Sequence, residues 1–77
     1  MTVTAYVTVK AHTGEADRLQ GEIGAVTGVD SVDIVAGDVD FIAKVAVDDT
    51  GDVRDVVAST ITGLDGVEDT RMYVAME

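Results

Sequence analysis

The chain has 77 residues and a formal net charge of −10, from fifteen Asp and Glu residues against five Lys and Arg residues. Nucleic-acid binding depends on clustered Lys and Arg, and here these residues are scattered singly among carboxylates, which excludes direct DNA or RNA binding. The lack of Cys excludes disulfides and thiolate sites, and no apolar run is long enough to span a membrane.

The size and composition favour one small globular domain over residues 1–77. Apolar residues make up 47% of the chain and aromatic residues only 4%, so Val, Ile, Leu and Ala must build the core. High negative charge, with Asp favoured over Glu and little Lys, is typical of a halophile, and we expect a haloarchaeal protein. No basic and apolar leader opens the chain, so we expect a cytoplasmic location.

The first two elements are a strand and an amphipathic helix. Apolar residues alternate from Thr2 to Lys10, which predicts a strand. After His12, the segment Thr13-Gly14-Glu15 predicts the N-cap of a helix that Gly28 ends. The apolar residues of this helix recur at spacings of three and four, and they are Ala16, Leu19, Ile23 and Val26.

Two further strands follow and are joined by a tight turn. The run from Val29 to Ala36 predicts a second strand, with Val32 and Ile34 facing inward. The run from Phe41 to Val47 predicts a third strand. Between them, Gly37-Asp38 indicates a hairpin turn of the II′ kind.

A second helix and a last strand complete the order. The helix opens at Asp48-Asp49-Thr50-Gly51-Asp52, and Gly63 and Gly66 end it. Its apolar stripe is Val53, Val56, Val57, Ile61 and Leu64. The Asp residues at its start lack calcium-loop spacing, so we interpret them as capping and solvated residues. The run from Val67 to Met76 alternates again and predicts a fourth strand.

The resulting order, βαββαβ, predicts an α+β fold of the ferredoxin-like type. Its two halves resemble each other, since Thr13-Gly14 recurs as Thr50-Gly51. A duplicated βαβ unit forms a four-stranded antiparallel sheet with both helices on one face. The other face would then carry Tyr6, Val35, Ile42, Ala46, Tyr73 and Ala75. This surface is too apolar to face water, so we expect a second copy of the domain to cover it.

The segment from Val35 to Ile42, flanked by Gly28-Val29 before it and by Gly66-Val67 and Thr70 after it, suggests a family. It resembles the effector-binding (RAM) domain of the Lrp/AsnC, or leucine-responsive, regulators, and the resemblance runs from about Val3 to Met76. The chain departs from the family pattern in two ways: Thr27 and Asp65 stand where Pro often precedes Gly-Val, and Val39 stands where a bulky or aromatic residue is common.

The resemblance implies a dimeric α+β barrel in which two domains pair sheet to sheet and dimers assemble into rings. It implies that an amino acid binds between dimers near the Gly-x-x-Asp hairpin, at Gly37, Asp38, Asp40, Thr70 and Met72, with Tyr6, Val35, Ile42 and Tyr73 in the dimer interface. Family members usually carry a helix-turn-helix DNA-binding domain. We therefore expect a stand-alone effector module that acts in transcriptional regulation, by itself or with full-length Lrp/AsnC regulators.

No catalytic, cofactor or metal site is predicted. His12 is the only His, and neither Ser31 nor Ser59 has a His nearby in the sequence, so no triad is proposed. Asp38 and Asp40 are one residue apart and could jointly meet an ammonium or a hard cation, or be solvated charge at a hairpin tip. Two other functions remain open: a small oxygenase-like enzyme of the dimeric α+β barrel type, and a structural partner that only assembles with regulators.

Overall fold

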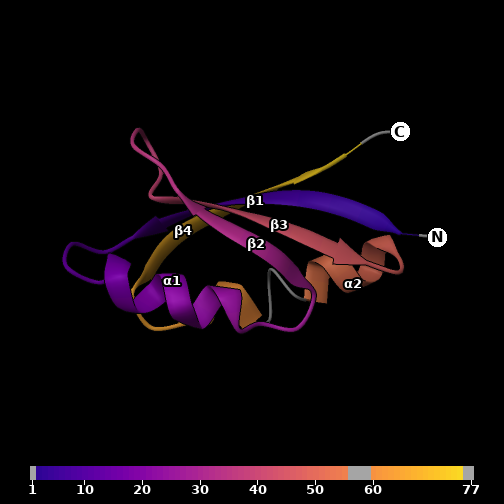
Figure 1. Ribbon diagram of the computed structural model, residues 1–77, viewed down its shortest axis with the longest axis horizontal. Coiled ribbons are helices and arrows are strands. Elements are labelled where there is room, and N and C mark those ends of the chain that lie inside the picture. The colour runs from indigo at the N-terminus through magenta and orange to yellow at the C-terminus, as the bar shows by residue number, and fades with distance from the viewer. Residues whose placement is uncertain (1, 56–59, 76–77) are drawn as a thin grey trace.

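The computed structural model describes residues 2–55 and 60–75, and it contains the six elements in the expected order. A four-stranded sheet forms one layer, and both helices lie on one side of it (Figure 1). This arrangement confirms the ferredoxin-like α+β fold. The elements are β1 (Val3–Ala11), α1 (Ala16–Gly24), β2 (Val29–Ile34), β3 (Phe41–Val47), α2 (Thr50–Arg54) and β4 (Val67–Val74).

The sheet has the strand order β2-β3-β1-β4, and every neighbouring pair is antiparallel. β1 is therefore central, and β2 and β4 form the two edges. Val7 of β1 lies opposite Ala43 of β3 on one side and opposite Met72 of β4 on the other. Because paired residues point to the same face of a sheet, these registers determine which side chains share each face.

The face toward the helices, here called the covered face, forms the core. It places Ala5, Val7 and Val9 of β1 against the helices with no exposed surface. The rest of the core comes from both helical segments and from β3, and its fully buried members are Leu19, Ile23, Phe41, Ala43, Val45, Val53 and Ile61. The core is mostly aliphatic, as the composition predicted.

The other side, here called the open face, carries the alternate residues of the same strands and has no helix over it (Figure 1). Tyr6 pairs with Tyr73, and Thr8 lies between Ile42 and Arg71. The open face consists of Thr4, Tyr6, Thr8, Lys10, Ser31, Asp33, Ile42, Lys44, Ala46, Asp69, Arg71 and Tyr73.

The start of α1 differs from the expectation. The helix begins at Ala16 and its N-cap position is Glu15, the last residue of the predicted N-cap segment, but no side chain caps it. Gly14 adopts a φ of +88°, and the Glu15 amide donates to the His12 carbonyl, so a turn separates Thr13 from the helix. The predicted apolar stripe is confirmed: Leu19 and Ile23 are fully buried and the other two members pack against the core.

The connection between β2 and β3 is longer than a two-residue turn. β2 ends at Ile34, which pairs with Phe41, so residues 35–40, here called the hairpin, lie between the strands and the predicted II′ turn is wrong. Val32 packs against the core as expected. Ile34 points to the covered side but is 60% exposed, because it ends an edge strand that has a neighbour on one side only.

The second helix keeps its predicted start. The side chain of Asp49 accepts a hydrogen bond from the Asp52 amide at 3.1 Å and so caps α2, as predicted for this acidic segment. Val53 and Ile61 of the predicted stripe are fully buried, and Leu64 packs against the core. Val56 and Val57 lie outside the described residues. The strand predicted to Met76 is observed as β4, which ends at Val74.

Candidate functional site

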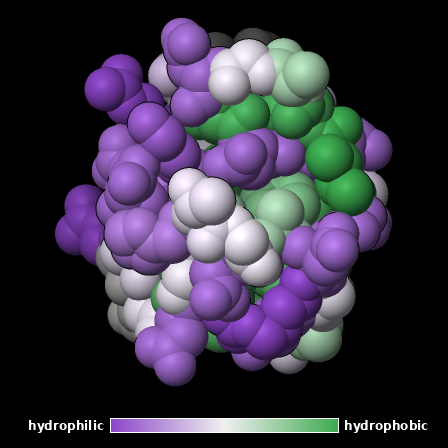
Figure 2. Space-filling view, turned by 90° about the vertical axis from the view of Figure 1, so that its left-hand side faces the viewer, coloured by the Kyte–Doolittle hydropathy of each residue, from purple (hydrophilic) through white to green (hydrophobic). Residues whose placement is uncertain are grey.

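The hairpin holds three of the predicted ligand residues, Gly37, Asp38 and Asp40, and projects from one end of the sheet (Figure 1). Gly37 has a φ of +154°, which a side chain would strain, so the sequence needs glycine there. Asp38 follows it and is exposed. Seen from the hairpin end, apolar side chains gather in the upper right of the view, with polar ones to the left and below (Figure 2).

Asp40 closes the base of the hairpin. Its amide donates to the Val9 carbonyl at 2.9 Å, and its carbonyl accepts from the Val35 amide at 2.9 Å. Its side-chain Oδ2 accepts a hydrogen bond from the Ala11 amide at 2.8 Å, in a partly buried position. This carboxylate therefore already has a protein partner, which the sequence alone did not reveal.

The other two predicted ligand residues lie on β4. Thr70 pairs with Val9 and Met72 with Val7, so both point to the covered side, and Met72 is 40% exposed at the edge of the sheet. The hydroxyl of Thr70 lies 2.9 Å from that of Thr62, which ties β4 to the segment after α2.

The hairpin and the predicted β4 residues do not meet within one chain. β1 lies between β3 and β4, and with neighbouring strands roughly 5 Å apart, β3 and β4 are separated by about 10 Å. The chain thus brings Gly37, Asp38 and Asp40 together at one end, and Thr70 and Met72 together on the far edge.

Ion pairs lie around the C-terminal end of β1, at the same end of the sheet as the hairpin. Glu68 lies 3.4 Å from Nζ of Lys10 and 3.7 Å from Nδ1 of His12. These side chains are about half exposed, so such pairs contribute little to stability, typically about 0–1 kcal/mol. His12 is also held by its backbone, since its amide donates to the Gly66 carbonyl at 2.7 Å.

Arg18 fastens α1 to the turn that precedes β4. Its guanidinium bonds the carboxylates of Glu15 and Glu22 and donates to the Asp65 carbonyl at 2.8 Å. The hydrogen bond to Glu15 is the main cause that raises the pKa of Arg18. Desolvation, the next in size, lowers the pKa, and the nearby charges of Glu22, Glu15 and Asp65 raise it further. Gly66 has a φ of +95°, and a Cβ there would meet the guanidinium at 2.9 Å, so glycine permits this contact.

The predicted interface residues divide between the sheet and the hairpin. Tyr6 is 43% exposed, Tyr73 is 55% exposed, and Ile42 is partly buried on the same open face. Val35 lies just beyond β2, in the hairpin, and is also partly buried. Three of the four residues therefore share one continuous face, and Val35 borders it.

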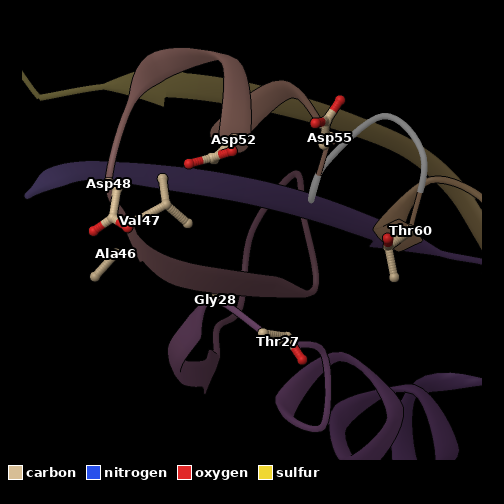
Figure 3. Close-up of a pocket in the computed structure, with 8 residues that line it drawn as sticks. All are labelled: Thr27, Gly28, Ala46, Val47, Asp48, Asp52, Asp55 and Thr60. Carbon is tan, nitrogen blue, oxygen red and sulfur yellow. The ribbon is translucent and has the colours of Figure 1, made fainter.

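A hollow of about 720 Å³ lies at the opposite end of the sheet (Figure 3). It is bounded by the turn before β2, the end of β3, α2 and the segment that contains Thr60, and none of the predicted ligand residues lines it. Its lining residues are Thr27, Gly28, Ala46, Val47, Asp48, Asp52, Asp55 and Thr60. The sequence interpretation missed this hollow because its walls combine the turn before β2 with residues 46–55 and Thr60, which lie far from that turn in the chain.

The described residues hold no group of three or more His, Asp or Glu side chains arranged to bind a metal ion. No helix within residues 2–55 and 60–75 is long and apolar enough to cross a membrane.

Similarity to known proteins extends over nearly the whole chain. The family model of the Lrp/AsnC ligand binding domain matches residues 4–77. The leucine-responsive regulatory protein of Haemophilus influenzae is 34% identical over 61 residues, which is 79% of this chain and 37% of that protein. The chain thus spans less than half the length of this curated relative.

Solved structures give the same fold. A crystal structure of a protein from Thermus thermophilus superposes with a TM-score of 0.93 at 31% identity, and the match covers 97% of this chain and 94% of that one. A transcriptional regulator from Neisseria meningitidis, solved as a complex with L-methionine, superposes with a TM-score of 0.86 at 17% identity. That match covers 97% of this chain and 50% of the regulator, and it concerns the fold alone.

Proposed function

The chain belongs to the family of Lrp/AsnC ligand-binding domains, and on that premise we propose that it binds a free amino acid or a related small effector between copies of itself. The observation that carries the proposal is the division of the predicted ligand residues. Asp38 projects on the hairpin and Met72 lies on the far edge strand, with β1 between them. The regulator from N. meningitidis, with its bound L-methionine, supports an amino acid as the class of effector.

A thermal-shift screen of the amino acids at high salt tests this function directly. A ligand that binds only the folded protein stabilises it by about 2.7 kcal/mol at a hundredfold excess over its Kd. We expect at least one amino acid to raise the Tm, with calorimetric titration giving its Kd. If no amino acid raises the Tm of the wild-type protein, binding of a free amino acid is rejected.

Mixing two variants tests whether the site lies between copies. Asp38→Ala removes a hairpin group, and Met72→Ala removes a group on β4. Each variant alone should bind the effector weakly, but a mixture of the two should regain part of the binding, because some interfaces then pair an intact hairpin with an intact β4. A mixture that binds no better than either variant would place the whole site within one chain.

We propose that the open face pairs with the same face of a second copy. Tyr6 and Tyr73 lie side by side there by strand register, and Ile42 is close to them. Large exposed aromatic side chains on a continuous face are typical of subunit interfaces. Light scattering at micromolar concentration should give at least a dimer, and a monomer would reject this pairing. We also predict that dimers assemble into rings, and the same measurement tests this prediction.

We further propose that effector binding regulates transcription by changing how the domain assembles with itself or with full-length Lrp/AsnC regulators. The domain would act in the cytoplasm without touching DNA through its own residues, because its charge opposes contact with phosphates. We also predict that the domain acts without an attached DNA-binding domain. The size of the native protein on an immunoblot tests this prediction. Light scattering with and without effector tests the change in assembly.

A second candidate is a structural partner that assembles with regulators and binds no effector. The observation in its favour is that none of the predicted ligand residues lines the hollow at the opposite end of the sheet. The screen separates the two functions, because an intact oligomer with no shift for any amino acid would favour the structural role. The similarity to regulators favours both of these binding roles over an oxygenase-like enzyme.

A further inference from the structure

The side chain of Asp40 replaces a missing strand partner. The ladder between β1 and β3 ends at the pair Val9 and Phe41. Two residues further along β1, the Ala11 amide donates instead to Oδ2 of Asp40 at 2.8 Å. A hydrogen bond from an amide to a carboxylate is charge-assisted and strong, and its loss leaves a partly buried amide without an acceptor.

The same stretch of β1 connects the two halves of the predicted effector site. The Ala11 amide bonds toward the hairpin through Asp40, and the next amide, that of His12, donates to the Gly66 carbonyl just before β4. Asp40 also bonds both Val35 and Val9 through its backbone. The base of the hairpin is thereby fixed to β1, and β1 is fixed to the start of the strand that carries Thr70.

We propose that Asp40 is a positioning residue of the effector site, which acts through the Ala11 amide and does not bind the effector's ammonium group itself. This inference rests on the proposed function and deepens it. This role requires an oxygen atom that accepts a hydrogen bond, but it does not require a negative charge. Asp38 is exposed and has no hydrogen bond or ion pair within the described residues. Asp38 is therefore the hairpin carboxylate that is available to contact a cationic group of the effector.

Oδ1 of Asp40 makes no hydrogen bond to the described residues, so a direct contact with the effector is the competing role. The two roles respond differently to Asp40→Asn. An amide oxygen still accepts from the Ala11 amide, so a positioning role is rescued by Asn. A carboxylate that neutralises an ammonium is not replaced by a neutral amide, so a direct contact is lost in Asn as fully as in Ala.

The test compares Asp40→Asn with Asp40→Ala, and uses L-methionine as the titrant at high salt. We expect Asp40→Asn to keep the Kd within threefold of wild type and Asp40→Ala to raise it at least tenfold. Asp38→Asn is the matched control, and it should raise the Kd at least tenfold. Equal losses in both Asp40 variants, with Asp38→Asn unchanged, would overturn the proposal.

A second measurement needs no effector. Hydrogen exchange of the Ala11 amide should stay slow in Asp40→Asn and in Asp38→Asn, and should become at least tenfold faster in Asp40→Ala. Unchanged exchange in Asp40→Ala would overturn the positioning role even if L-methionine does not bind. If wild type binds no amino acid, the proposed function fails, whereas exchange still decides the positioning role. If Asp40→Ala does not fold, Asp40→Asn decides alone: slow Ala11 exchange supports the role and exchange at least tenfold faster overturns it.

Discussion

The two faces of the sheet are built from alternate residues of the same strands, yet they meet opposite environments. On the covered face, Val7 and Phe41 have no exposed surface, whereas on the open face Tyr6 and Tyr73 expose about half of theirs. The cause is the position of the helices, which both lie on one side (Figure 1). The chain thus covers one face of its sheet by itself and leaves the other face uncovered.

Charge separates the two faces as well. The open face carries Lys10, Lys44 and Arg71 together with Asp33 and Asp69, so its charges nearly balance. The helical layer carries Arg18 and Arg54 with many more carboxylates. These acidic residues are Glu15, Asp17, Glu22, Asp49, Asp52 and Asp55. A second copy therefore meets less repulsion at the open face than at the helices.

The largest effect should come from the covered face. Phe41→Ala removes the largest fully buried side chain and leaves a cavity, which costs roughly 3–5 kcal/mol. That is a large part of the stability of a small domain. Urea unfolding at fixed protein concentration measures the loss. Ile42→Ala, one residue along the same strand, is the matched control, and a loss as large as that of Phe41→Ala would contradict the difference between the faces.

A charge on the open face should separate subunits without unfolding them. In a symmetric pair, Ile42→Asp introduces one carboxylate from each copy, and like charges across an interface cost several kcal/mol. We expect dimerisation at least a hundredfold weaker, or about 2.7 kcal/mol, with the circular dichroism of the wild type. Light scattering over a dilution series measures it. Ile42→Val should remain dimeric, and a dimeric Ile42→Asp would remove the open face from the interface.

These predictions also show what the sequence could and could not establish. The alternation in β1 and β3 assigned the two faces correctly, because a period of two survives in any sheet. The predicted two-residue turn was wrong, and Ile34 is exposed although it points inward as predicted, because both features depend on how neighbouring segments meet. The bond from the Ala11 amide to Asp40 spans 29 residues, so no local pattern could predict it.

The helical layer should make stability depend on salt. Lowering the salt from 1 M to 0.1 M lengthens the screening distance from about 3 Å to about 10 Å. Several like-charge contacts, each worth a few tenths of a kcal/mol, then add to a loss on the order of 2 kcal/mol. Thermal unfolding should show a lower Tm in dilute salt. Asp17→Asn on α1 should reduce this dependence more than Asp69→Asn on the open face, and the reverse order would place the repulsion on the sheet.

The smallest effect concerns the start of α2, which helps to close the covered face. Oδ1 of Asp49 accepts from the Asp52 amide, and losing such a cap costs about 1 kcal/mol. Asp49→Ala should therefore lower the Tm by roughly 4–8 °C in a domain of this size. Removing a negative charge also relieves repulsion in this acidic chain, so the loss should be largest at high salt, where only the hydrogen bond counts.

Two control variants separate the cap from the charge. Asp49→Asn keeps an oxygen that can accept from the Asp52 amide, so its Tm at high salt should stay close to that of wild type. Asp48→Ala removes a neighbouring exposed carboxylate that does not cap the helix, and it should change the Tm little. If Asp49→Ala is as stable as Asp48→Ala at high salt, the side chain of Asp49 does not hold the start of α2, and closure of the covered face rests on buried residues such as Val53 and Ile61 alone.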